Sequence, residues 1–278
     1  MASSDEPIRA HIEALVRAGS VRRKTAAVQL EAEIRRREEV LRQTFRRYVS
    51  PHIADKILED SQLRDTLHLP DTLPVPADGR ARVVVVFTDL RGFTSIAEQL
   101  EPRSVVPLLN EYFSLLTEIT FRHEGTVFHM AGDCLMLAFG VPFAQPDSAQ
   151  RAVHAAREML DSFRALAHSW KERYGVDAGL GIGINEGDVV AGNIGSASYM
   201  NYTIIGDAVN IAARLCQRAR SGEILFSGAL KHSLDAEGVD VGATPLPPLQ
   251  LRGRSHPIDI FCVPLETRLQ LSAEPAAG

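Results

Sequence analysis

Cysteine is scarce in this chain. Cys134, Cys216 and Cys262 are the only cysteines among 278 residues, and they are far apart. Their number and spacing exclude a disulfide framework and the paired cysteines of zinc sites, and they suit a reducing compartment. We expect the three thiols to be small core residues.

Long hydrophobic runs are also missing. No apolar stretch comes near the roughly 18 residues of a membrane-spanning helix, and the N-terminus lacks the charged and apolar regions of a signal peptide. We therefore expect a cytoplasmic protein with no membrane span. Glu residues interleave with the Arg-rich N-terminal runs, which is more typical of a solvated helix face than of a nucleic-acid partner. No Ser-His-Asp or Cys-His catalytic arrangement is recognisable.

Composition divides the chain into four parts. Residues 1–70 are rich in charge and predict a helical segment, with a weak coiled coil over 21–48 that Arg37 and Thr44 interrupt. The Pro-containing stretch 71–79 breaks any helix and is predicted to be a linker. We expect the main folded domain at 80–266 and a C-terminal tail at 267–278.

The most informative residues of the main domain are two aspartates beside apolar strands. Residues 83–87 predict a buried strand that brings Asp89 to its end, and the following Arg91 to Thr94 segment is predicted to open a helix whose free N–H groups favour phosphate. Asp133 follows a glycine between the strand-like stretches 126–130 and 134–139, which predicts a tight hairpin. Carboxylates at neighbouring strand ends can bind Mg²⁺, although a Gly-Asp pair can also simply form a turn.

A third segment, around Y-T-I-I-G-D-A-V-N-I-A-A-R, predicts a helix from Ala208 capped by Asp207. Asn210 and Arg214 are four residues apart and therefore share one face of this helix. An amide and a guanidinium on the same helix face can bind a hydroxyl group and a phosphate oxygen of a ligand. The alternative interpretation is that this face is simply exposed to solvent.

The remaining periodicity completes an α+β fold. It predicts helices at 103–123 and 149–174, a strand pair at 178–184 and 188–194 joined by a turn at 185–187, and later strands at 223–226, 248–252 and 257–264. This βαββαβ order predicts a ferredoxin-like mixed sheet with helices on one face.

These motifs, F-T-D-L-R-G-F-T, A-G-D, Y-T-I-I-G-D-A-V-N-I-A-A-R-L and L-R-G-R-S-H-P-I, occur in the order seen in class III nucleotidyl cyclases, and the chain resembles that family from 80 to 265. The resemblance implies that Asp89 and Asp133, helped by the Leu90 backbone carbonyl, bind two Mg²⁺ or Mn²⁺ ions. It also implies that Asn210 and Arg214 orient the ribose and stabilise the transition state.

The same resemblance suggests how the rest of the nucleotide is bound. Arg252 matches the basic residue that contacts the terminal phosphates, and Phe93 and Thr94 stand in the phosphate-side motif. The base-selecting positions hold His129 and Thr203, where adenylate cyclases usually have Lys with Asp or Thr and guanylate cyclases have Glu and Cys. His and Thr can satisfy adenine and can also accommodate guanine.

The resemblance therefore implies an adenylate cyclase that makes cyclic AMP from ATP. A guanylate or relaxed-specificity cyclase and a catalytically silent regulatory homologue remain alternatives, and His129 is alternatively a strand residue facing its neighbour. The family pattern further implies a head-to-tail homodimer with two shared sites, and an upstream signal that arrives through the N-terminal helix.

Overall fold

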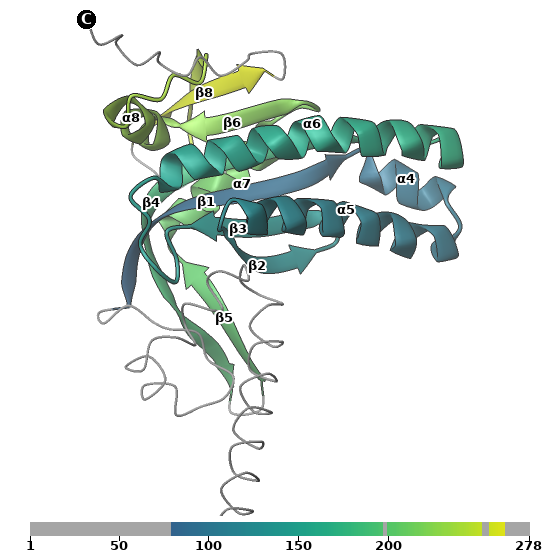
Figure 1. Ribbon diagram of the computed structural model, residues 1–278, viewed down its shortest axis with the longest axis horizontal. Helices are drawn as coiled ribbons and strands as arrows, with labels where there is room; N and C mark the ends of the chain where they lie inside the picture. The colour runs from purple at the N-terminus through teal and green to yellow at the C-terminus, as the bar shows by residue number, and fades with distance from the viewer. Residues whose placement is uncertain (1–78, 197–198, 252–255, 265–278) are drawn as a thin grey trace, which may run out of the picture. The chain divides into compact units, whose positions relative to one another are not determined.

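The computed structural model describes residues 79–196, 199–251 and 256–264, which form an α+β domain around one mixed sheet (Figure 1). The predicted N-terminal helical segment, nearly all of the 71–79 linker, the C-terminal tail and Arg252 lie outside these residues. Within them, no helix combines the length and apolar character needed to cross a bilayer.

The first half of the domain follows the predicted βαββαβ order. Its elements are β1 (Arg80–Arg91), α4 (Phe93–Gln99), α5 (Pro102–Arg122), β2 (Thr126–Ala131), β3 (Cys134–Phe139), α6 (Ser148–Tyr174) and β4 (Gly179–Ser196). The four strands are arranged β2-β3-β1-β4, and all neighbours in this order are antiparallel. This half carries both predicted metal-binding aspartates.

The second half extends the sheet beyond β4. It consists of β5 (Tyr199–Ile205), α7 (Asp207–Arg218), β6 (Glu223–Ser227), α8 (Gly228–Ala236), β7 (Thr244–Leu249) and β8 (Ile258–Pro264). β6 pairs with β4 in parallel and β8 in turn pairs with β6 and β7 antiparallel, which confirms the mixed sheet. The strand predicted at 248–252 lies earlier in the chain, where β7 spans Thr244–Leu249. The prolines of the 244–249 stretch are tolerated because β7 forms the edge of the sheet among the described residues, where it pairs only with β8.

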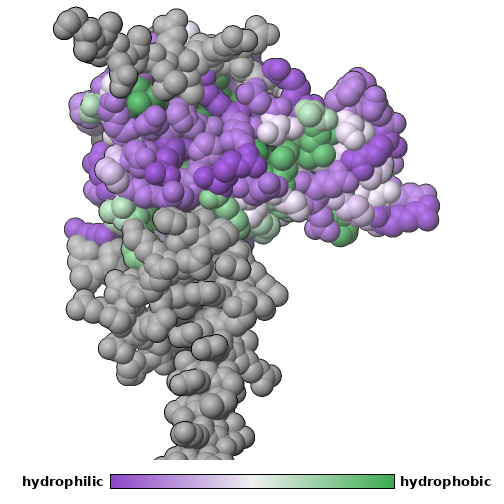
Figure 2. All heavy atoms as spheres, in the orientation of Figure 1, coloured by the Kyte–Doolittle hydropathy of each residue, from purple (hydrophilic) through white to green (hydrophobic). Residues whose placement is uncertain are grey.

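Helices cover both faces of the sheet, so the prediction of helices on one face was wrong. Val83 to Val86 are each at most 1% exposed, which requires apolar cover on both sides of β1. The alternate residues Val84 and Val86 pack with α5 and α6, whereas Val83 and Val85 pack on the side of α7. The outer surface of α5 and α6 is mostly hydrophilic, as expected for amphipathic helices (Figure 2).

β4 is one continuous strand rather than the predicted strand pair with a turn at 185–187. Every residue from Gly179 to Val190 has a partner in β1, and the remainder of β4 pairs with β5. Asn185, a turn-forming residue by propensity, is instead buried and donates from Nδ2 to the Ala208 carbonyl oxygen at 3.0 Å. Ladder pairing and burial therefore override the local turn signal.

The start of α7 differs by one residue from the prediction. The N-cap is Gly206, without a side-chain cap hydrogen bond, and Asp207 is the first helical residue instead of the cap. A Cβ at Gly206 would lie 3.0 Å from the Asp188 carbonyl oxygen, so the chain passes close to β4 before the helix starts. The Asp207 carboxylate then lies in the first turn, where the helix dipole favours negative charge.

Candidate active site

Asp89 lies two residues before the end of β1, as the sequence predicted, and is partly exposed. Its side chain is 31% accessible, whereas the next residue, Leu90, is buried. Since side chains alternate along a strand, Asp89 lies on the α7 side of the sheet and the Leu90 side chain lies in the core under α5 and α6. Only the backbone of Leu90 is therefore available to a ligand.

Asp133 lies in the two-residue turn of the β2–β3 hairpin, which confirms the predicted tight turn. Gly132 adopts the left-handed conformation that this turn requires, with φ 60°. The next residue, Cys134, pairs directly with Asp89 across β1 and β3. The hairpin therefore brings Asp133 beside Asp89.

The electrostatics of the pair show how close the two carboxyl groups are. Burial first, and then the charge of Asp89, raise the pKa of Asp133 above its usual value, while the N–H groups of Asp133 and Leu90 act in the opposite direction. Two carboxylates and a backbone segment thus converge on one point. The two carboxylates repel each other, and a divalent cation such as Mg²⁺, which prefers oxygen ligands, would relieve this repulsion.

The pair alone would not saturate a metal ion. In the described part of the chain, no group of three or more His, Cys, Asp or Glu side chains is arranged to hold one. Mg²⁺ is commonly bound through one or two carboxylates, with water and substrate phosphates as the other ligands. The residues present therefore fit a metal that arrives with a phosphorylated substrate.

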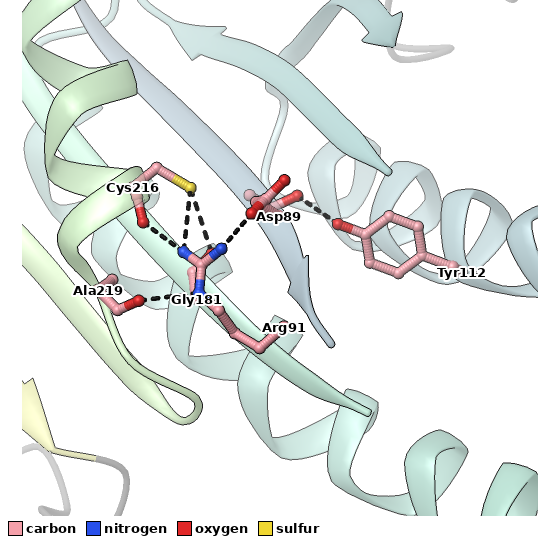
Figure 3. A network of polar contacts seen from close by, with 7 residues as sticks. Asp89, Arg91, Tyr112, Gly181, Cys216 and Ala219 are labelled. Atoms are coloured by element: carbon pink, nitrogen blue, oxygen red, sulfur yellow. Dashed lines mark hydrogen bonds and ion pairs between the residues drawn. The ribbon is translucent and has the colours of Figure 1, made fainter. Parts of the chain in front are cut away.

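Arg91, which the sequence reasoning did not single out as a site residue, joins Asp89 to α7 (Figure 3). Its guanidinium donates to the Asp89 carboxylate and to the carbonyl oxygens of Cys216 and Ala219, the latter at 2.8 Å. The alternation of side chains along a strand could have indicated this contact, because Arg91 is two residues after Asp89 and therefore lies on the same side of β1.

Two thiols lie near this network, those of Cys134 and Cys216. Burial raises the pKa of Cys134 to about 11 and that of Cys216 to about 12. The Cys216 thiol donates to the Gly181 carbonyl oxygen at 3.4 Å. A raised pKa disfavours the nucleophilic thiolate, and the burial of these side chains agrees with the packing role expected from the sequence.

Asn210 and Arg214 lie, as predicted, on one exposed face of α7. They line a groove of about 830 Å³ between α7 and the segment that follows β7, together with Gln217 and Leu251. The Arg214 guanidinium donates from Nη1 to Gln217 Oε1 at 3.0 Å. Neither Asp89 nor Asp133 lines this groove. One chain thus carries two separate clusters of predicted site residues.

The predicted base-selecting residues lie on neighbouring strands. His129 is exposed on β2 beside an irregularity in the β2–β3 ladder, and Thr203 is partly buried on β5. The residues immediately before them, Phe128 and Tyr202, stack with ring centroids 5.8 Å apart. This contact places β2 and β5 side by side.

Phe93 and Thr94 open α4, which begins as the sequence predicted. Gly92 precedes them in a left-handed conformation, φ 85°, with no side-chain cap. Phe93 packs against the core, whereas Thr94 is exposed. Thr94 and the free N–H groups of this first turn are therefore the parts of the segment open to a ligand.

Comparison with known proteins is consistent with this geometry. The sequence model of the adenylate and guanylate cyclase catalytic domain matches residues 75–263. The adenylyl cyclase CyaB from P. aeruginosa is 32% identical with a TM-score of 0.64, covering 68% of this chain and 96% of that one. The guanylyl cyclase Cya2 is 35% identical with a TM-score of 0.60, covering 66% and 92% of the two chains.

Curated relatives are longer proteins. Adenylate cyclase 1 of Rhizobium meliloti is 31% identical over 185 residues, which are 66% of this chain and 27% of that protein. An uncharacterized protein of Mycobacterium tuberculosis is 38% identical over 147 residues, which are 52% of this chain and 26% of that protein. This chain thus spans about a quarter of the length of the curated relatives that it matches.

Proposed function

Because this chain belongs to the adenylate and guanylate cyclase catalytic domain family, the class III nucleotidyl cyclases, we propose that it converts ATP into 3′,5′-cyclic AMP and pyrophosphate. The observation that carries the proposal is the carboxyl pair of Asp89 and Asp133, held side by side by the pairing of β1 and β3. Such a pair suits the metal-assisted transfer of a nucleotide phosphoryl group.

ATP is the proposed substrate because of the residues at the base-selecting positions. Neither His129 nor Thr203 is the Glu or Cys expected of a guanylate cyclase, and a His with a Thr hydroxyl can pair with the acceptor and donor of adenine. Similar solved structures include both an adenylyl and a guanylyl cyclase, so the second candidate is a guanylate or relaxed-specificity enzyme.

In the proposed reaction, the ribose 3′-oxygen attacks the α-phosphorus and its proton passes to solvent water, while the bond to the bridging oxygen breaks and pyrophosphate leaves. Asp89 and Asp133, with the Leu90 carbonyl, would hold two Mg²⁺ or Mn²⁺ ions. When bound, these ions lower the pKa of the attacking hydroxyl and neutralise the leaving phosphates. We assign Asn210 to orienting the ribose and Arg214 to the charge that develops on the phosphoryl oxygens. No protein base is needed.

We further propose that the working enzyme is a head-to-tail homodimer. In one chain, Asn210 and Arg214 line a groove that excludes Asp89 and Asp133. A two-fold axis that brings the groove of one chain to the carboxyl pair of its partner would complete two equivalent sites. Arg252 lies outside the described residues, and we assign it to the terminal phosphates on the family resemblance alone.

Substrate choice is tested with purified protein, Mg²⁺ or Mn²⁺, and equal concentrations of ATP and GTP, with products separated by chromatography. We expect cyclic AMP to dominate, and Asp89→Asn to reduce its formation by at least about 100-fold, because metal sites supply several kcal/mol of transition-state stabilisation. Asp161→Asn, which alters an exposed carboxyl on α6, is the matched control. An excess of cyclic GMP would favour the second candidate, and the absence of any cyclic nucleotide would indicate a silent homologue.

The shared site is tested by mixing an Asp89→Ala chain with an Arg214→Ala chain. Each is inactive alone, but half of a randomly exchanged population is heterodimer, and each heterodimer has one intact site of two. Activity should therefore recover to about a quarter of the wild-type value. No recovery, with subunit exchange demonstrated by differently tagged chains, would show that the site lies within one subunit.

A further inference from the structure

Arg91 connects the two clusters of site residues within one chain. It is the last residue of β1, and its guanidinium contacts Asp89 on one side and the carbonyl oxygens of Cys216 and Ala219 on the other (Figure 3). Those carbonyls belong to the final turn and C-cap of α7, the helix that carries Asn210 and Arg214. One side chain thus links a carboxylate of the candidate metal site to the helix of the second cluster.

The fold makes room for this guanidinium. A Cβ atom at Gly181 would lie 2.4 Å from Arg91 Nη2 and 2.8 Å from Arg91 Cζ, so only glycine allows the planar group to lie across β4 at this point. The Arg91 side chain is only 24% exposed, so its contacts are partly shielded from water. The carbonyl groups at a helix C-terminus carry partial negative charge, and a planar fork of donors can contact two of them together. The Cys216 carbonyl oxygen also accepts from the Ala219 N–H at 3.1 Å.

The charge of Arg91 compensates the carboxyl pair. Asp89 and Asp133 lie side by side, and the Arg91 guanidinium donates to the Asp89 carboxylate. A divalent ion bound to the pair would do the same with twice the charge, and two cations that share the Asp89 carboxylate would repel each other.

We propose that Arg91 is a positioning residue whose charge substitutes for the metal at Asp89, and whose donor fork fixes Asp89 relative to the end of α7. This inference rests on the proposed function, since it takes Asp89 and Asp133 as the metal ligands. The charge and the donor geometry of the Arg91 side chain have separate effects. The positive charge opposes metal binding, and the fork geometry supports catalysis by holding Asp89 in a fixed position against the end of α7.

Two substitutions separate the two properties. Arg91→Met removes both charge and fork, whereas Arg91→Lys retains the charge and loses the fork. Binding of Mn²⁺ alone, without nucleotide, is measured by electron paramagnetic resonance, and kcat is measured at saturating metal and nucleotide. Arg103→Met is the matched control, because it removes a guanidinium whose side chain is 83% exposed. Asp89→Asn tests whether Mn²⁺ binds at this carboxylate at all.

We expect Arg91→Met to bind Mn²⁺ about tenfold more tightly than the wild type, and Arg91→Lys to bind it within about twofold, since only the first loses the repelling charge. Both variants should lose kcat by about 10- to 100-fold, because Asp89 is no longer held in a fixed position against the end of α7. A purely structural role would instead weaken binding and thermal stability in parallel in both variants.

The outcomes distinguish the inference from the function on which it rests. If Asp89→Asn weakens Mn²⁺ binding but Arg91→Met leaves it unchanged or weaker, the role of Arg91 is refuted and the metal site stands. If kcat is retained in Arg91→Lys, the coupling through the fork is refuted. If Asp89→Asn does not weaken Mn²⁺ binding, the metal assignment itself fails.

Discussion

Gly183, in the middle of β4, determines how closely α7 lies on the sheet. A Cβ atom at this position would be 2.0 Å from the backbone nitrogen of Cys216 and 2.4 Å from the carbonyl oxygen of Ala212. Both are backbone atoms of α7, so no side-chain rotation can relieve the clash. Gly183→Ala must therefore push the helix away, because ordinary contact begins near 3.4 Å and the shortfall from 2.0 Å is 1.4 Å.

The displacement should affect stability and activity together. Ala212 and Leu215 are fully buried in the α7 interface, and a shift of this size would disturb their packing. Overpacking typically costs 1–3 kcal/mol, and we expect about 3 kcal/mol here because rigid backbone is involved. For a domain of this size the loss corresponds to a decrease in Tm of roughly 6–12 °C. Asn210 and Arg214 move with the helix, so kcat should fall by about 100-fold.

Gly192→Ala is the matched control, since it lies on the same strand and a Cβ there meets nothing within 4 Å. Urea unfolding gives the free energy of unfolding for both variants, and the cyclase assay gives kcat. A Gly183→Ala protein that unfolds within about 1 kcal/mol of the wild type and keeps its kcat would refute this account of α7 packing.

Three further changes test other parts of the site. Asp133→Asn should abolish cyclisation yet make the metal-free protein more stable at pH 7, because the raised pKa of Asp133 means that its charged form destabilises the folded state. This gain in stability should shrink as the pH falls towards the ordinary Asp pKa of 3.8. Thermal unfolding measured at several pH values tests the direction of this change. Tyr112→Phe removes a hydroxyl that shares a buried 2.9 Å hydrogen bond with Thr88, and urea unfolding should show a loss of about 1–2 kcal/mol, with an unchanged midpoint as the contrary result. His129→Lys should retain ATP cyclisation and lower KM for ATP; an ATP-to-GTP preference unaffected by Lys, Glu or Ala at this position would make His129 a structural residue and direct attention to Thr203.

Much of the local structure could be predicted from the sequence. The apolar run before Asp89, the glycine before Asp133 and the four-residue spacing of Asn210 and Arg214 each depend on a few adjacent residues. Their conformations are set by strand alternation, turn stereochemistry and helix periodicity, all of which are short-range. The strand end, the hairpin turn and the exposed helix face are therefore found where these patterns indicate.

Tertiary structure decided the features that depend on distant partners. Residues 185–187 do not form the predicted turn, because β4 pairs continuously with β1 there. The buried run in β1 requires cover on both faces of the sheet, and α7 covers the second face. Arg91 reaches Cys216 and Ala219, more than 120 residues away in the chain, because two glycines of β4 leave space for the guanidinium and for α7. The sequence by itself determined the chemical groups and their local geometry. Which of them meet was decided by packing, because it depends on backbone approaches that no local pattern encodes.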